Sequence, residues 1–112
     1  MNTITNYYTT THQGFHLKTV MNPVLFSYKT AISSFLEGMN NGKSKTSQRH
    51  LVRRITHTHN FMNTVAAAGF DFYHEDNQDL IVILEDVKAL MPDLLKHGNI
   101  IKDKPLYFDS WG

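Results

Sequence analysis

The sequence predicts an α+β fold: a single small domain with two packed amphipathic helices, one or two β-hairpins and a C-terminal helix. Its 112 residues are typical of one domain, 1–112, and no repeat or low-complexity linker divides them. Two stretches place apolar residues at steps of three and four, whereas others are rich in the β-branched and aromatic residues that favour strands. Hydrophobic residues make up 41% and charged residues 19% of the chain, which excludes a disordered composition.

The first 21 residues predict a β-hairpin. Residues 3–11 consist mainly of threonine, tyrosine and isoleucine, and His12, Gln13 and Gly14 then interrupt this pattern. From Phe15 to Met21 the side chains alternate as they do on a half-buried strand. We therefore expect the two segments to pair around the interruption.

The next element is predicted as a helix over 23–39. Asn22 and Pro23 are typical of a helix start, because asparagine caps free N–H groups and proline suits the first helical position. Asn40, Asn41 and Gly42 provide an end. The apolar stripe consists of Leu25, Tyr28, Ile32, Phe35 and Met39.

A second helix is predicted over 46–68. Ser44, Thr46 and Ser47 are candidate caps for its start, and Gly69 is a candidate stop. Its stripe consists of Leu51, Ile55, Thr58, Met62, Val65 and Gly69. We expect the two helices to pack through their stripes.

Residues 70–84 predict a second hairpin. Phe70, Phe72 and His74 alternate with polar neighbours and Tyr73, and the polar run 75–79 separates them from the apolar run 80–84. That run is short and β-branched, as a buried strand is. The alternative is a long helix that begins at Leu80 and reaches Lys96.

The C-terminal helix is predicted to begin at Asp86, its candidate cap, and to end at Gly98. Pro92 lies inside this pattern and costs about 3 kcal/mol there, so a kink or two short helices are expected. The aromatic residues Tyr107 and Trp111 of the tail are expected to pack on the domain. The predicted core comprises Leu25, Ile32, Phe35, Leu51, Ile55, Met62, Val65, Phe72, Val82, Leu84, Leu90 and Leu94.

The net charge of +1 conceals two opposed blocks. Residues 38–70 contain five Lys and Arg residues and no acid, whereas residues 71–86 contain six Asp and Glu residues and no Lys or Arg. Such blocks indicate either two separate charged surfaces or two surfaces that neutralise each other in the fold. The sequence leaves both readings open.

The basic residues of the second helix fall opposite its apolar stripe. Cations in the first turns of a helix are unfavourable, because the macrodipole is positive there and no acid stands four residues away. An anionic partner would explain them. The candidate binding residues are Lys43, Lys45, Arg49, His50, Arg53, Arg54 and His57, and the candidate acidic partner surface is Glu75, Asp76 and Asp79.

These observations predict a small, cytoplasmic, non-enzymatic binding protein, of the kind that phages or mobile elements use as regulators. It would engage nucleic acid, or a complex that handles nucleic acid, through the basic helix face. The alternative is a protein-binding inhibitor or adaptor of host machinery that acts by charge complementarity or acidic mimicry. A homodimer is compatible with either function, and no apolar run is long enough to predict a membrane partner.

No catalytic, cofactor or metal site is predicted. Cysteine is absent, which excludes thiol catalysis and thiolate metal sites and fits a reducing compartment. The run Gly38–Ser44 lacks the P-loop spacing, since three residues and not four separate its glycines. It still offers amides, hydroxyls and ammonium groups that suit a phosphate before a helix N-terminus.

Overall fold

The protein is described by a computed structural model that covers residues 11–98 and 100–101, with side chains from residue 19 onward. These residues form α2 (Thr11–Asn40), α3 (Arg49–Ala67), a 3₁₀ turn η1 (Glu75–Asn77) and α4 (Gln78–Leu95). This part of the chain contains no strand, so the predicted α+β class is wrong and the described fold is helical. None of its helices is both long and apolar enough to cross a bilayer.

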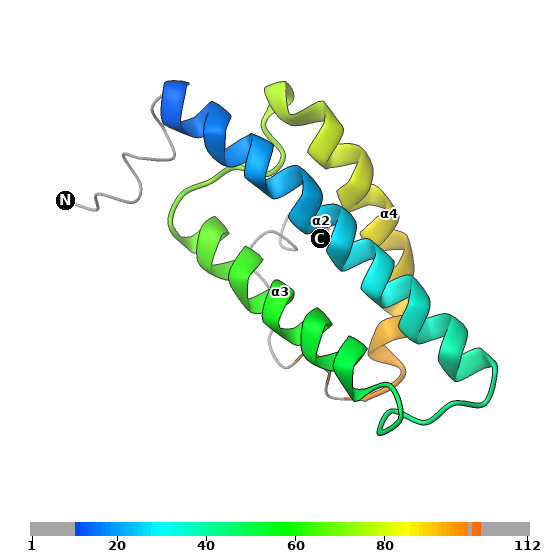
Figure 1. Ribbon diagram of the computed structural model, residues 1–112. Helices are drawn as coiled ribbons and strands as arrows, with labels where there is room; N and C mark the ends of the chain where they lie inside the picture. Colours follow the sequence, from blue (N-terminus) through cyan, green and yellow to red (C-terminus); the bar gives the residue numbers. More distant parts are fainter. Residues whose placement is uncertain (1–10, 99, 102–112) are drawn as a thin grey trace.

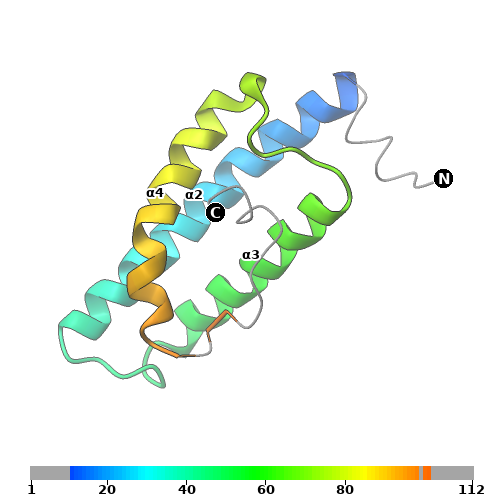
Figure 2. The same ribbon diagram turned by 180° about the vertical axis from the view of Figure 1, so that it is seen from behind.

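Helix α2 lies between the other two helices and packs against both (Figures 1 and 2). Helix α3 returns antiparallel to α2, whereas α4 runs parallel to it. Two side-chain pairs fix the parallel register: Asn22 Nδ2 lies 3.0 Å from Asp79 Oδ2, and Lys29 Nζ lies 2.8 Å from Asp86 Oδ2. Both pairs join residues 57 apart in the sequence. The step of seven residues from Asn22 to Lys29 on α2 therefore lies beside an equal step from Asp79 to Asp86 on α4.

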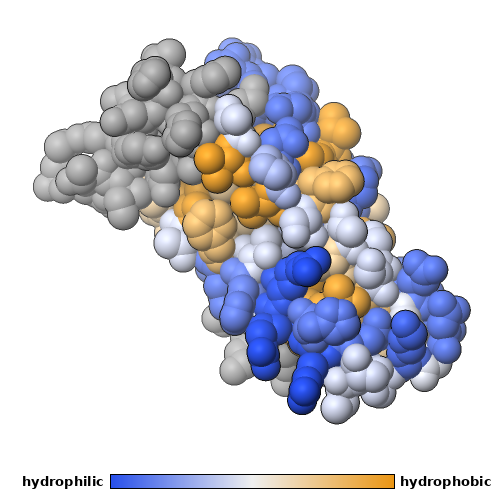
Figure 3. Space-filling view, viewed as in Figure 1, coloured by the Kyte–Doolittle hydropathy of each residue, from blue (hydrophilic) through white to orange (hydrophobic). Residues whose placement is uncertain are grey.

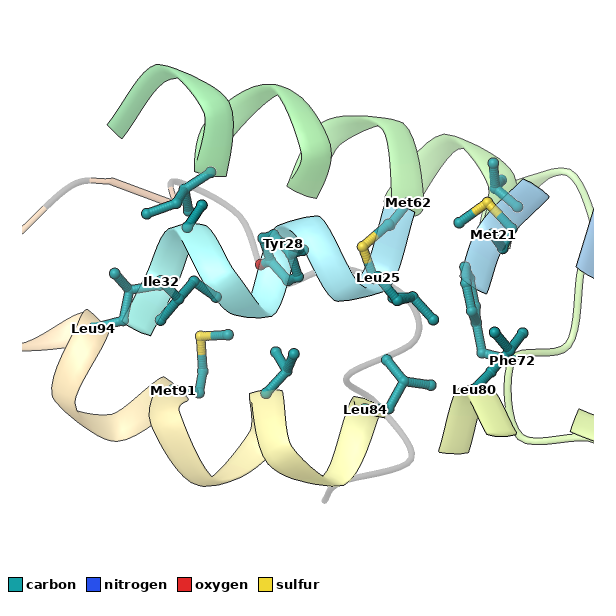
Figure 4. Packing of buried hydrophobic residues seen from close by; sticks show 14 of the residues in the cluster. Met21, Leu25, Tyr28, Ile32, Met62, Phe72, Leu80, Leu84, Met91 and Leu94 are labelled. Atoms are coloured by element: carbon teal, nitrogen blue, oxygen red, sulfur yellow. The ribbon is translucent and has the colours of Figure 1, made fainter. Parts of the chain in front are cut away.

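The core forms around one stripe of α2. Met21, Leu25, Tyr28, Ile32 and Phe35 are completely buried at steps of four and three, which place them on one helical face. Figure 4 shows Met62 of α3 and Leu84, Met91 and Leu94 of α4 directed toward this stripe. The predicted core residues that are buried are Leu25, Ile32, Phe35, Ile55, Met62, Val65, Phe72, Leu84 and Leu94.

Three predicted core residues depart from the expectation. Leu51 and Leu90 are only partly buried. Val82 is 63% exposed, because it lies on the face of α4 opposite Leu80, Leu84 and Val87. Its inclusion in the core depended on a strand that does not form.

The predicted N-terminal hairpin is wrong where the structure describes it. Residues 11–21 form the first turns of α2, while residues 3–10 lie outside the described residues. Asn22 and Pro23 therefore do not begin a helix, and Pro23 lies inside one. Burial of Met21 on the same stripe as Leu25 favours the helix over the local strand preference, because tertiary packing supplies most helical stability.

The second predicted hairpin is also wrong, and the alternative long helix is confirmed. Residues 80–84 belong to α4, and Leu80, Leu84 and Val87 are buried at helical spacing. Asp86 does not cap a helix but lies within α4, where it pairs with Lys29. Pro92 also lies inside α4, which continues to Leu95 as one helix and does not divide into two.

The predicted ends of α2 and α3 are confirmed. Gly42 and Gly69 have φ values of 86° and 109°, which glycine adopts without strain. The amides of Lys43 and Phe70 then return to the carbonyls of Gly38 and Val65, the longer bond of a Schellman motif. The predicted packing of Tyr107 and Trp111 falls outside the described residues.

Candidate nucleic-acid interface

The predicted binding residues of α3 are all exposed. Arg49, His50, Arg53, Arg54 and His57 lie on the solvent side, because Ile55 and Met62 occupy the face buried against α2. Figure 3 shows strongly hydrophilic side chains gathered over the N-terminal part of α3. The structure thus brings these five residues onto one helix surface.

The two charge blocks do not neutralise each other. Within the described residues the ion pairs of lysine are Lys29–Asp86 and Lys96–Asp93, and no salt bridge involves an arginine. The acidic residues Glu75, Asp76 and Asp79 are exposed near the start of α4, at the end of the molecule where α3 finishes. The start of α3 lies at the other end of α4, a helix of 18 residues that is about 27 Å long.

Lys45 has a structural contact that the sequence did not reveal. Its Nζ donates a hydrogen bond of 2.6 Å to the carbonyl oxygen of His97, just beyond the end of α4. The C-terminal carbonyls of a helix attract cations. Lys45 therefore ties the loop before α3 to α4, and Lys43 is the cation of this loop that remains for a ligand.

The N-terminus of α3 carries no side-chain cap. Its N-cap residue is Gln48, which makes no capping hydrogen bond. Ser44 and Ser47, predicted as caps, instead bond to each other: Ser44 Oγ accepts from the Ser47 amide at 3.0 Å, and Ser47 Oγ donates to the Ser44 carbonyl at 2.9 Å. The positive end of the α3 dipole is thus left beside Arg49 and His50.

A cavity of about 520 Å³ lies between the end of α2 and the start of α3. Gln48 lies in its wall and is only 3% exposed, and its Nε2 has no hydrogen-bond partner among the residues that the structure describes. The absence of a side chain at Gly38 makes room for Gln48, because a Cβ on residue 38 would overlap the Gln48 side-chain amide. The lining residues are Ser34, Glu37, Gly38, Asn41, Lys43, Ser47, Gln48, His50 and Leu51.

Phe61 is a candidate residue that the sequence reasoning missed. It is 44% exposed on α3, although phenylalanine is usually buried. It follows His50, Arg54 and His57 at steps of four, three and four, so the four side chains form a row along one side of the helix. The same helical spacing that places His57 on the outside could have identified Phe61 from the sequence.

Two other titratable groups, the His59 ring and the Tyr73 hydroxyl, are buried. His59 is 2% exposed, and its Nδ1 lies 3.2 Å from the hydroxyl of Tyr28 in the core. Burial raises the pKa of Tyr73 above the ordinary tyrosine range, and the negative charge of Glu85 adds to this effect. Both residues lie away from the row on α3 that contains Phe61.

The described residues contain no group of three or more His, Cys, Asp or Glu side chains that could hold a metal ion. Comparison with protein-family models, with curated proteins and with solved structures finds no match for this chain.

Proposed function

We propose that this protein binds single-stranded nucleic acid along the exposed side of α3 and has no catalytic role. The observation that carries this proposal is the row of His50, Arg54, His57 and Phe61, with Arg49 and Arg53 beside it. No acid of the described part of the chain forms an ion pair with these residues. The row is about 17 Å long, which is enough for several contacts with one strand.

The cations provide the affinity. Lys43, Arg49, Arg53 and Arg54 are exposed, and none of them forms a salt bridge within the described residues. These cations repel one another, and the positive end of the α3 dipole raises the potential around them further. Phosphate groups relieve this repulsion and release their counterions.

Phe61 favours a single strand over a duplex. Proteins that bind single strands combine a basic path for the phosphates with aromatic side chains on which unpaired bases stack. The exposed ring of Phe61 stands at the end of such a path. In a duplex the bases are already stacked on each other, so this ring would contact none of their faces.

A second candidate function is favoured by the opposite end of the molecule. Glu75, Asp76 and Asp79 are exposed there, separated from the basic surface. Such a surface can imitate phosphates for a basic protein, which would make the chain an inhibitor or adaptor of host machinery. In that case the acidic residues, and not those of α3, would determine binding.

The proposal is tested by titrating a labelled single strand and its matched duplex with the protein and following fluorescence anisotropy. Phe61→Ala should weaken single-strand binding about tenfold, since stacking contributes about 1–3 kcal/mol for each base. Phe26→Ala is the matched control, because Phe26 is 57% exposed but lies on α2. Equal effects of the two variants, or tighter binding of the duplex, would contradict the proposal.

A further inference from the structure

We infer that the cavity between α2 and α3 binds the phosphomonoester of a nucleotide, either a free mononucleotide or the phosphorylated end of a strand. Its volume of about 520 Å³ falls within the usual range for small-molecule pockets. For the strand end, this inference rests on the function proposed above. For the free nucleotide, it stands independently.

The donors of the cavity suit a phosphate. Lys43 contributes an ammonium group, Ser34 contributes a hydroxyl, and His50 contributes a ring nitrogen. All of them are exposed residues, so a ligand can reach them from solvent. A phosphate offers several acceptor oxygens and can bond to more than one of these groups at once.

The buried amide of Gln48 provides independent support for a ligand. A buried donor without a partner destabilises a protein, and such groups are rare in folded proteins. Gln48 Nε2 is one of these groups, and Gln48 belongs to the cavity wall. This amide has almost no accessible surface, so a ligand oxygen would satisfy it once the Gln48 side chain turned toward the cavity, beside the N-terminus of α3, which has no side-chain cap.

Glu37 indicates that the ligand is more than inorganic phosphate. Its carboxylate lines the same cavity and would repel a bare anion. It accepts hydrogen bonds only, so it suits a ligand that also carries hydroxyl or amino donors. A nucleotide has both features, because its ribose and base donate where its phosphate accepts.

The cavity also adjoins the row on α3. His50 belongs to both, and Arg54 follows it by one turn along the helix. A strand with its bases near Phe61 and its backbone along Arg54 would therefore bring its terminal phosphate to Lys43. A strand end and a free nucleotide would use the same donors.

Calorimetric titrations separate these sources of phosphate. The probes are AMP, adenosine, inorganic phosphate, and a short oligoadenylate with a 5′-phosphate, a 3′-phosphate or hydroxyl ends. We expect AMP to bind at least about tenfold more tightly than adenosine, because its phosphate forms charge-assisted hydrogen bonds that adenosine cannot form. A phosphorylated oligoadenylate should have a similar advantage over the unphosphorylated one.

Three variants assign the effect to the cavity. Lys43→Gln should abolish the advantage of phosphorylated probes, whereas Arg53→Gln, outside the cavity, should weaken all oligoadenylates equally. Glu37→Gln should strengthen binding of inorganic phosphate and reduce the preference for AMP over it. The side-chain amide resonance of Gln48 should shift on addition of AMP to the wild type.

The outcomes distinguish this inference from the proposed function. Equal binding of all oligoadenylates, with no binding of AMP, would overturn the inference and leave the proposed function intact. Binding of AMP that depends on Lys43, without binding of any strand, would support the cavity and overturn the proposed function. Absence of binding by every probe would overturn both.

Discussion

The hydroxyl of Tyr73 is buried without a hydrogen-bond partner in the turn that precedes α4. Burial and the charge of Glu85 both disfavour its ionised form, so its pKa lies above that of an unfolded chain. Because the pKa of Tyr73 is higher in the folded chain than in the unfolded chain, its ionisation leaves the free energy of unfolding unchanged below pH ~10 and lowers it as the pH rises above that value.

Tyr73→Phe tests this assignment. The free energy of unfolding of the wild type should fall above pH ~10, since the unfolded tyrosine ionises there and the folded one does not. The variant should show a smaller fall, and near neutral pH it should be as stable or about 1 kcal/mol more stable, because no buried hydroxyl remains unpaired. Urea denaturation across this range measures both effects, and identical pH profiles would contradict the assignment.

Residues on the outside of α3 were predictable, because helical periodicity alone places Arg49 and Arg53 opposite Ile55. Phe61 was predictable in the same way, because it lies four residues after His57 on the side away from Ile55 and Met62. Gln48 was not, because its burial depends on close contact with Gly38, ten residues earlier on another helix.

At the scale of elements, α3 begins under electrostatic strain. Its N-cap residue is a glutamine whose side chain makes no capping hydrogen bond, its first turn contains no acid, and its first residue is an arginine. Folding alone favours the opposite arrangement, with acids at the N-terminus of a helix. We interpret this cost as the consequence of a binding surface, as protein function often conflicts with local stability.

Arg49→Glu separates stability from binding. The variant should raise the free energy of unfolding by about 0.3–1 kcal/mol, because the carboxylate complements the positive end of the α3 dipole. It should also weaken single-strand binding, and more strongly than Arg49→Gln does. Thermal unfolding and anisotropy measure the two effects, and a destabilised variant would show instead that Arg49 contributes packing.

The helical predictions were correct where an apolar stripe extended over several turns. Within the described residues the strand predictions were wrong, and they rested on patterns of only five to seven residues. Residues 15–21 alternate like a strand over only seven positions, yet Met21 is buried on the stripe that continues through Leu25. The run 80–84 is apolar throughout, so it contains no period that separates strand from helix. In both cases packing against a neighbouring helix decided the structure.

At the scale of the whole molecule, the fold separates the charges that the sequence places next to each other. Helix α3 carries the chain from the basic end to the acidic end, so residues 38–54 and 71–79 lie far apart although they are close in sequence. Two acids of α4 contact side chains of α2: Asp86 pairs with Lys29, and Asp79 accepts a hydrogen bond from Asn22. Within residues 11–98 and 100–101, the arginines of α3 form no such ion pair.

The central claim is that the cations of α3 and Lys43 bind phosphates. The salt dependence of single-strand binding tests it most directly. With about four phosphates neutralised, log K should fall against log salt with a slope of about −2.8 for a single strand, or about −3.6 for a duplex. The triple variant Arg49→Gln, Arg53→Gln, Arg54→Gln should remain folded and have a slope near −0.7, whereas Lys88→Gln, an exposed control on α4, should retain the wild-type slope. A folded triple variant with the wild-type slope, or a wild type that binds no strand at low salt, would contradict the claim.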